Sequence, residues 1–341
     1  MPDILSLSKD EVISALSAMG EPAYRAKQVF DWLYVKKVSS CEGMSSLSKA
    51  LRDKLAVQYP FPVLTEKIAQ ESKDGTRKFL FALDDGERIE TVFIPTEKRA
   101  TLCISSQAGC KFGCTFCASG LGGWKRNLTP GEILGQVLHV MRAVRPTPVT
   151  HIVFMGVGEP FDNYDNVLKA VRLLNDKDGL NIAARRITIS TCGIIPGIER
   201  MASEGLQVEL SVSLHAASEA MRARLMPVNK KYPLKDLLRA CRKYAETTNR
   251  QVTFEYILIK GLTCTPQAID ELSTLMRGWL SKVNLIPCNP VKEFAYYPPD
   301  TCAVEEFQKA LERNGVICTL RSARGQDISA ACGQLRHERH A

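Results

Sequence analysis

The apolar residues of the first sixty positions recur every three or four residues, which is the spacing of one face of an α-helix. This pattern predicts three helices. The first is capped by Ser8 and ends at Gly20, and the other two span residues 24–35 and 47–57. The predicted helices carry seven basic side chains: Arg25, Lys27, Lys36, Lys37, Lys49, Arg52 and Lys54. A solvated surface and a surface that faces nucleic acid both fit this charge.

The hydrophobic period changes between residues 64 and 94. Lys73-Asp74-Gly75-Thr76 and Asp84-Asp85-Gly86-Glu87 have the composition of hairpin turns. They predict strands over residues 77–83 and 88–94. We therefore expect a small antiparallel unit that joins the helical region to the rest of the chain.

From Thr101 onward, strand-like and helix-like runs alternate. The predicted strands cover residues 101–105, 151–155, 186–190, 209–214, 252–259, 283–287 and 316–321. The predicted helices cover residues 130–143, 166–174, 234–247, 266–278 and 304–314. This alternation predicts an α/β fold with a parallel sheet and right-handed crossovers. An open doubly wound sheet and a full or partial β/α barrel both fit, and in either of them ligands bind at the carboxyl ends of the strands.

The composition is that of a soluble globular protein. The 341 residues are 45% hydrophobic and 24% charged, and no apolar run approaches the length of a transmembrane helix. The N-terminus lacks the pattern of a signal peptide, so we expect a cytoplasmic protein that does not bind membranes. The formal net charge of +8 mildly favours a polyanionic partner.

Three of the twelve cysteines, Cys110, Cys114 and Cys117, fall within eight residues. Their C-x3-C-x2-C loop follows the first strand of the predicted parallel sheet. Structural zinc usually takes four ligands, whereas three thiolates in one loop suit an iron–sulfur cubane that keeps one iron open. A zinc knuckle is the alternative. The number of cysteines in so long a chain indicates a reducing compartment in which some thiols serve metal or redox chemistry.

The cysteine loop resembles the C-x3-C-x-aromatic-C signature of radical S-adenosylmethionine enzymes. The resemblance implies that Cys110, Cys114 and Cys117 hold a 4Fe–4S cluster whose open iron binds S-adenosylmethionine. Cleavage of that cofactor by an electron from the cluster then yields a 5′-deoxyadenosyl radical. An external electron donor such as flavodoxin or ferredoxin is implied as well, and so is a partial, TIM-like β/α barrel.

Polar residues follow several of the predicted strands. In Met155-Gly156-Val157-Gly158-Glu159-Pro160, glycines would let the backbone approach a ligand, and the carboxylate could accept hydrogen bonds from an ammonium group. Ser190-Thr191-Cys192-Gly193, Ser213-Leu214-His215-Ala216 and Cys288-Asn289-Pro290 end three other strands. These strings resemble the cofactor contacts of one family, the RNA adenine methyltransferases RlmN and Cfr. The resemblance assigns cofactor binding to Gly158, Glu159, Ser190, Ser213, Leu214, His215 and Asn289.

The string from Arg321 to Leu335 resembles the C-terminal signature of the same family. The resemblance implies that Cys332 and Cys103 are catalytic and that Glu90 accepts a proton from the substrate ring. Carbon 2 of adenine is a poor nucleophile and a thiolate is a good one, so Cys332 can accept the methyl group first. Cys103 would then attack the Cys332 sulfur and leave a disulfide that needs external reduction. The other cysteines are expected to be inert: Cys41, Cys192, Cys241, Cys264, Cys288, Cys302 and Cys318.

This resemblance divides the chain into an N-terminal helical RNA-binding domain (1–62), a β linker (63–95), the radical barrel (96–326) and a catalytic C-terminal segment with the tail (327–341). The implied substrates are an adenosine near the peptidyl-transferase centre of 23S rRNA and the adenosine 3′ of the anticodon in tRNA. Pro160 favours methylation of carbon 2. Methylation of carbon 8, as in Cfr, and a non-catalytic iron–sulfur or zinc RNA-binding protein are the alternatives. We expect a monomer, and we expect His337 and His340 to be a loose end rather than a metal site.

Overall fold

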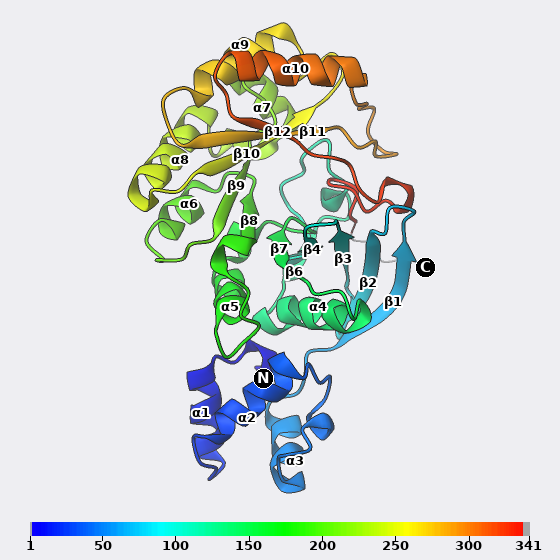
Figure 1. The fold of residues 1–341 in the computed structure, drawn as a ribbon, viewed down its shortest axis with the longest axis vertical. Helices are drawn as coiled ribbons and strands as arrows, with labels where there is room; N and C mark the ends of the chain where they lie inside the picture. The colour runs from blue at the N-terminus through cyan, green and yellow to red at the C-terminus, as the bar shows by residue number, and fades with distance from the viewer. Residues whose placement is uncertain (1, 337–341) are drawn as a thin grey trace.

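One curved sheet of ten strands organises the computed structural model, which describes residues 2–336 (Figure 1). The strand order is β1-β2-β3-β4-β7-β8-β9-β10-β11-β12. The first four strands are β1 (Leu64–Glu71), β2 (Arg77–Leu83), β3 (Arg88–Pro95) and β4 (Ala100–Cys103). The others are β7 (His151–Phe154), β8 (Ile187–Thr191), β9 (Glu209–Ser213), β10 (Val252–Leu258), β11 (Ser281–Pro287) and β12 (Cys318–Leu320). A separate hairpin pairs β5 (Gln107–Gly109) with β6 (Trp124–Asn127).

The order of the strands decides between the two architectures that the sequence allows. From β4 to β12 every neighbouring pair is parallel, and the strands stand side by side in chain order. In a doubly wound sheet the order of the strands reverses at a switch point, and in this sheet the order does not reverse. In the part of the chain that the structure describes, β1 and β12 stand at opposite ends of the sheet, so the barrel is partial, as predicted. The antiparallel strands β1, β2 and β3 extend the same sheet.

The helices lie around the outside of the parallel strands (Figure 1). They are α4 (Pro130–Ala143), α5 (Tyr164–Asn175), α6 (Ile195–Met201), α7 (Glu219–Leu225), α8 (Leu234–Thr248), α9 (Pro266–Met276) and α10 (Thr301–Arg313). The α4 helix begins at Pro130, its first residue. Thr129, the residue before the helix, and Glu132, the third residue in it, form a reciprocal capping box. The central strand β10 is buried along its whole length, because sheet neighbours and helices exclude water from both of its faces.

The N-terminal helices pack together beside the barrel (Figure 1). They are α1 (Lys9–Ala18), α2 (Arg25–Phe30) and α3 (Lys49–Gln58). The predicted helix over residues 24–35 is confirmed, but its last turn, Asp31–Val35, widens into a π-helix. Across the junction, the backbone N–H of Gly131 donates to the Ser6 hydroxyl at 2.8 Å. No helix within residues 2–336 is long and apolar enough to cross a bilayer.

The sequence pattern missed the strand β1 and the short elements β5, β6, α6 and α7. The β1 strand is exposed along nearly all of its length, so its side chains do not alternate between apolar and polar. It is an edge strand, and charged edge strands of this kind resist pairing with other chains. The tail histidines His337 and His340 lie outside the described residues.

Candidate active site

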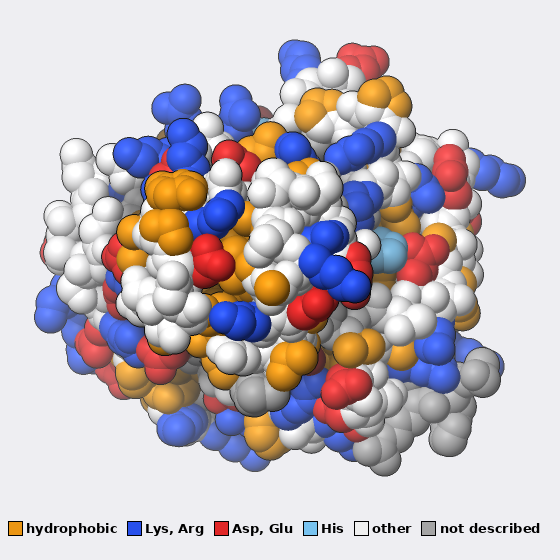
Figure 2. All heavy atoms as spheres, turned by 90° about the horizontal axis from the view of Figure 1, so that it is seen from below, with side chains coloured by type: hydrophobic (Ala, Val, Ile, Leu, Met, Phe, Trp, Pro, Cys, Tyr) orange, Lys and Arg blue, Asp and Glu red, His pale blue; other side chains and the backbone are white. Residues whose placement is uncertain are grey.

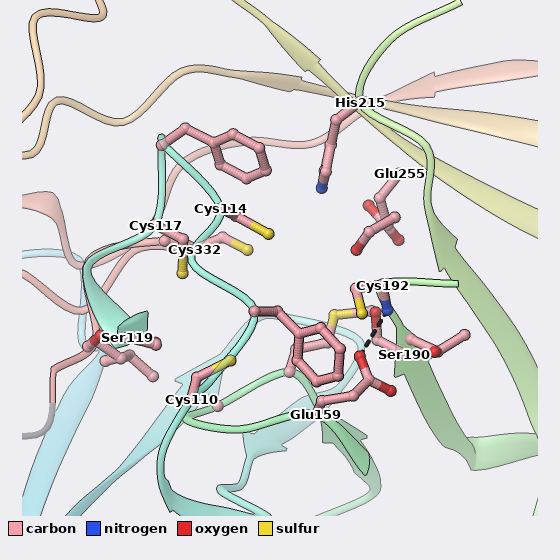
Figure 3. A pocket seen from close by; sticks show the side chains of 18 of the residues that line it. Cys110, Cys114, Cys117, Ser119, Glu159, Ser190, Cys192, His215, Glu255 and Cys332 are labelled. Atoms are coloured by element: carbon pink, nitrogen blue, oxygen red, sulfur yellow. Dashed lines mark hydrogen bonds between the residues drawn. The ribbon is translucent and has the colours of Figure 1, made fainter. Parts of the chain in front are cut away.

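A cavity of about 1050 Å³, open to solvent, lies at the carboxyl ends of the parallel strands. Figure 3 shows the sulfurs of four cysteines, Cys110, Cys114, Cys117 and Cys332, on one side of it and Glu255, His215 and Ser190 on the other. The cavity brings together ten of the residues that the sequence singled out: Cys110, Cys114, Cys117, Gly158, Glu159, Ser190, Ser213, His215, Asn289 and Cys332. Three do not line it: Leu214, Cys103 and Glu90. The Leu214 side chain is fully buried in the core.

The three clustered thiols are half-buried in the cavity wall. Burial raises the pKa of Cys110 to about 12 and also raises the pKa values of Cys114 and Cys117, so all three are neutral until a cation binds. Within residues 2–336, no three His, Cys, Asp or Glu side chains gather closely enough to surround a single metal ion. A cubane does not require that, because each thiolate binds a different iron. The arrangement is therefore compatible with an iron–sulfur cluster.

The glycines after β7 make room for protein backbone. A Cβ atom at Gly156 would lie 2.7 Å from the carbonyl group of Ile104. A Cβ atom at Gly158, whose φ is +107°, would lie 2.6 Å from the Cβ atom of Gln107. We expected these glycines to let the chain approach a ligand. In this structure glycine is needed at both positions because the loop after β7 passes close to the loop of Ile104 and Gln107. This close passage brings Glu159 into the cavity wall.

The carboxylate of Glu159 spans the ends of β7 and β8. Its Oε1 accepts the backbone N–H of Phe161 at 2.9 Å, and its Oε2 accepts that of Cys192 at 2.6 Å (Figure 3). Burial raises the pKa of Glu159, and these hydrogen bonds oppose the shift. A carboxylate has about four lone-pair sites, so Glu159 can accept further donors from a ligand.

His215 presents a polar nitrogen that lacks a partner. The residue is buried at the end of β9 with φ of +57°, and its ring meets that of Phe116 edge to face at 4.7 Å between centroids. Burial, assisted by the charge of Arg222, lowers the pKa of His215 to about 3, so the ring is neutral. Its Nδ1 has no hydrogen-bond partner among the described residues. Buried polar atoms are normally satisfied, so this nitrogen fits a hydrogen-bonding group of a bound cofactor.

Arg222 is a structural element of the site that the sequence analysis missed. Its guanidinium is buried beneath the ends of β8 and β9, where it donates to the carbonyl oxygens of Cys192 at 2.8 Å and Ser213 at 3.3 Å. It also donates to Asn229 Oδ1 at 2.7 Å. Arg222 thus holds two of the strand ends that line the cavity. It lies on the short, unpredicted helix α7, where an arginine is normally a surface residue.

The two cysteines assigned to catalysis line a second cavity of about 790 Å³ that adjoins the first. Cys103 is buried at the end of β4, and burial raises its pKa to about 12 against the opposing charge of Arg321. Cys332 lines both cavities and is the more exposed of the two thiols. Arg321, at the end of β12, also lines both cavities. Both cysteines are free thiols in this structure.

The C-terminal segment, which we define as residues 322–336, is held at the cavity by hydrogen bonds from several loops. Asn289 Nδ2 donates to the carbonyl oxygen of Cys332 at 3.0 Å. The backbone N–H of Ala118 donates to the carbonyl oxygen of Gly333 at 2.8 Å, and the hydroxyl of Ser119 donates to that of Leu335 at 2.8 Å. The cysteine loop and the segment that carries Cys332 are therefore directly connected.

Glu90 lies apart from both cavities, beneath the end of the C-terminal segment. Its carboxylate is paired with Lys78 Nζ at 3.0 Å and accepts the backbone N–H of Arg336 at 2.6 Å. Along β3, Glu90 stands two residues from Val92, which is the register partner of Cys103 on β4. Alternation places Glu90, Val92 and Cys103 on one face of the sheet. The structure thus places Glu90 on the same face as Cys103, and Glu90 lines neither of the two cavities.

Known proteins resemble the chain over nearly its full length. A profile described as "Radical SAM superfamily" matches residues 104–267, and one described as "Ribosomal RNA large subunit methyltransferase N-terminal domain" matches residues 2–59. The "Probable dual-specificity RNA methyltransferase RlmN" of Bacillus cereus (strain B4264) is 48% identical over 98% of this chain and 93% of its own length. The protein of that name from Geobacillus kaustophilus is 46% identical over the same shares. The crystal structure of a radical SAM methyltransferase from Sphaerobacter thermophilus superposes with a TM-score of 0.96 at 43% identity, covering 98% of this chain and 99% of that one.

Proposed function

The chain belongs to the RlmN family of radical S-adenosylmethionine RNA methyltransferases, and on that premise we propose that it methylates carbon 2 of adenosine. The proposed substrates are the peptidyl-transferase region of 23S rRNA and the adenosine 3′ of the anticodon in tRNA. The relatives named "dual-specificity" support two kinds of RNA substrate. One observation carries the mechanism: Cys332 lines both the cavity of the three clustered cysteines and the cavity of Cys103.

The first cavity would hold the cofactors. Cys110, Cys114 and Cys117 would bind a 4Fe–4S cluster. The contacts to S-adenosylmethionine are assigned to side chains and backbone around the strand ends: Gly158, Glu159, Ser190, Ser213, Leu214, His215 and Asn289. All of them except Leu214 line the first cavity. The unpartnered Nδ1 of His215 supports this assignment. When bound, the cluster and S-adenosylmethionine supply a methyl group and a radical that can remove a hydrogen atom.

The two catalytic thiols would have different roles in the reaction. The Cys332 sulfur takes the methyl group by forming a carbon–sulfur bond and then carries that carbon to the adenine ring. Once the carbon is attached to carbon 2, the Cys103 thiolate attacks the Cys332 sulfur and forms a disulfide as the sulfur–carbon bond breaks. The electron pair of that bond stays with the released carbon, which takes up a proton and becomes the methyl group of the product. Cys332 must therefore reach both the methyl donor and Cys103, and a position between the two cavities meets that requirement.

Glu90 is the proposed acceptor of the proton from carbon 2. Its place on the face of Cys103 supports the role. Its carboxylate would have to exchange its hydrogen bond to the Arg336 amide for contact with the ring. A target base must also leave its stack to reach such a cavity, as in other enzymes that modify bases. We propose that binding of the substrate displaces the end of the C-terminal segment from Glu90.

The N-terminal helices are the proposed contact for RNA phosphates. Figure 2 views the molecule from their side and shows Lys and Arg side chains spread across this face among acidic and hydrophobic ones. A net charge of +8 favours binding to a polyanion, and such binding weakens as salt rises. We further propose a monomer that receives electrons from flavodoxin or ferredoxin.

Identification of the methylated nucleoside tests this function. The protein with a reconstituted cluster is incubated anaerobically with reductant, S-adenosylmethionine and unmodified 23S rRNA or tRNA, and the RNA is digested for mass spectrometry. We expect 2-methyladenosine. 8-Methyladenosine would reassign the chain to Cfr-type chemistry, and RNA binding without any cleavage of S-adenosylmethionine would indicate a non-catalytic protein.

A variant of Cys103 tests whether Cys332 and Cys103 have these separate roles. In Cys103→Ser, Cys332 can still deliver its carbon, but the bond between Cys332 and the RNA cannot be resolved by disulfide formation. We expect a covalent protein–RNA adduct whose linkage maps to the peptide of Cys332. The matched control is Cys302→Ser, an exposed cysteine on α10, which should leave turnover unchanged. Free methylated product from Cys103→Ser at the rate of the unaltered protein would contradict the mechanism.

A further inference from the structure

The tip of the β1–β2 hairpin grips the C-terminal segment. Figure 1 shows the red end of the chain beside these two strands. The tip is the turn Ser72–Thr76, which the sequence marks only as a hairpin connection, and Ser72 and Thr76 are both buried there. The function proposed above gives this turn no role. Some 250 residues of chain separate it from the segment that it contacts.

The contact is reciprocal, because the hairpin turn and the C-terminal segment each contribute one carboxylate that accepts hydrogen bonds from the other. Asp327 Oδ1 accepts the hydroxyl of Ser72 at 2.6 Å, and its Oδ2 accepts the backbone N–H of Lys73 at 3.3 Å. In the opposite direction, Asp74 Oδ2 accepts the backbone N–H of Gly325 at 3.0 Å, while its Oδ1 accepts that of Thr76 at 2.9 Å. Hydrogen bonds to a charged acceptor are about twice as strong as neutral ones.

The backbone of the segment fits closely at this point. Gly325 has φ of +64°, and a Cβ atom there would lie 2.9 Å from Thr76 Cγ2 and 2.8 Å from the Cβ of Ala330. The backbone N–H of Ala330 donates to the carbonyl oxygen of Gly325 at 2.8 Å, so residues 325–330 form a closed loop seated on the hairpin tip. Ala330 and Leu335 then pack against Cys103 and Val92. The loop thus leads directly into the wall around the catalytic thiols.

Two more hydrogen bonds reach the segment on this side of Cys332: Gln326 Nε2 donates to Asn289 Oδ1 at 2.8 Å, and Lys78 Nζ donates to the carbonyl oxygen of Ser329 at 3.4 Å. The segment's regular structure is a single 3₁₀ turn, Gln326–Ile328, and the Cys332 side chain is exposed to the cavities. Hydrogen bonds to other parts of the chain therefore determine where the thiol lies. The hairpin tip, Lys78 and Asn289 bind the segment before Cys332, and Asn289, Ala118 and Ser119 bind it at and after Cys332.

We propose that Asp74 and Asp327 are positioning residues that hold Cys332 in reach of Cys103 and of the methyl donor. The proposal rests on the function assigned above. Neither carboxylate touches a reacting atom, and both act through the loop that they anchor. Loss of the anchor lets residues 325–335 open locally, which lowers the fraction of time that the thiol spends in its productive place. Cys110, Cys114 and Cys117 lie on a different loop, so cluster binding is not expected to change.

The test compares Asp327→Asn, Asp74→Asn and the double variant with Asp84→Asn. Asp84 occupies the next hairpin turn and forms no hydrogen bond or ion pair in the part of the chain that the structure describes, so it is a matched control. Ser72→Ala serves as a second variant that removes a donor but keeps both carboxylates. All are measured as full-length protein with a reconstituted cluster.

Three readouts separate positioning from general stability. The rate of Cys332 methylation by S-adenosylmethionine is followed by peptide mass spectrometry, and reductive cleavage of S-adenosylmethionine without RNA is measured on the same samples. The equilibrium constant of the Cys103–Cys332 disulfide is measured against dithiothreitol. Hydrogen exchange reports on residues 325–335.

We expect the two Asp→Asn variants to lower the methylation rate and the disulfide constant by roughly tenfold, given the usual strength of a hydrogen bond to a charged group. Hydrogen exchange of residues 325–335 should accelerate, whereas cleavage of S-adenosylmethionine and the Asp84→Asn control should not change. A disulfide constant and an exchange rate equal to those of the unaltered protein would overturn the proposal. Failure of the unaltered protein to methylate Cys332 would contradict the proposed function. The equilibrium constant of the Cys103–Cys332 disulfide would still test whether Asp74 and Asp327 position Cys332.

Discussion

The side chain of Asn289 joins the end of β11 to the backbone of Cys332. Its Nδ2 donates to the Cys332 carbonyl oxygen at 3.0 Å, and its Oδ1 accepts Gln326 Nε2 at 2.8 Å. The position of Asn289 after a parallel strand predicts a cofactor contact. In this structure both ends of its amide bind the C-terminal segment, while the residue also lines the cofactor cavity. Asn289 therefore links the cofactor cavity to the thiol that is proposed to accept the methyl group.

Replacement of Asn289 separates these two roles. If Asn289 mainly anchors the segment, Asn289→Ala should slow methylation of Cys332 by about tenfold, since the loss of a buried hydrogen bond costs about 1–3 kcal/mol. The affinity for S-adenosylmethionine should change little. Gln326→Ala removes only one of the two hydrogen bonds and should have a smaller effect. Equilibrium binding and peptide mass spectrometry measure the two quantities, and a large loss of affinity at an unchanged methylation rate would favour a cofactor contact.

Gly158 is expected to tolerate no side chain. Its φ of +107° disfavours any L residue, and a Cβ atom would also lie 2.8 Å from the backbone nitrogen of Gln107. Gly20 has φ of +79° but has no atom within 4 Å of such a Cβ, so Gly20→Ala should cost only about 1 kcal/mol. We expect Gly158→Ala to lower the melting temperature more than Gly20→Ala and to weaken cofactor binding. Equal melting temperatures for the two variants would contradict the account of the crossed loops.

Arg222 should be essential for stability. Arg222→Met leaves the carbonyl oxygen of Cys192 and the Oδ1 of Asn229 buried without their charged donor, at a cost of about 3 kcal/mol or more. Arg224 lies on the same helix but is exposed, so Arg224→Met should change the free energy of unfolding by no more than about 0.5 kcal/mol. Urea unfolding followed by circular dichroism compares the two. Similar midpoints would show that Arg222 does not support the strand ends.

The anchor at Asp74 should depend on pH. Burial alone would raise the pKa of Asp74, but hydrogen bonds from Thr76, Gly325 and Ser72 outweigh it and lower the pKa from 3.8 to about 2. Because the folded state holds the carboxylate ionised more strongly than the unfolded chain does, its contribution to stability is present above about pH 4. That contribution is lost as the pH falls toward 2.

Urea unfolding between pH 3 and 7 checks this dependence. Asp74→Asn should be less stable than the unaltered protein at neutral pH, and this difference in the free energy of unfolding should begin to narrow as the pH falls below about 4 toward the lowered pKa. Asp84→Asn should show no such difference. A difference that stayed constant down to pH 3 would mean that the Asp74 carboxylate is not held by the turn.

Local pattern was sufficient for most of the fold. The helix predicted over residues 130–143 coincides with α4, and the alternation after Thr101 predicts the parallel sheet, because each depends on neighbours in the chain. The strand β1 escaped prediction because it is an exposed edge whose side chains need not alternate. The choice between a doubly wound sheet and a barrel also lay outside the pattern, since strand order is a property of pairing between distant segments.

The site divides in the same way. The spacing of Cys110, Cys114 and Cys117 belongs to one short loop, so the sequence alone reveals a cluster-binding motif, and with the C-terminal signature it points to the family. The grip of Asp74 on Gly325, the burial of Arg222 and the pairing of Glu90 with Lys78 each join residues that are distant in sequence or carried by unpredicted elements. Only the tertiary structure decides such contacts, because the burial and direction of a side chain depend on which distant segments fold around it.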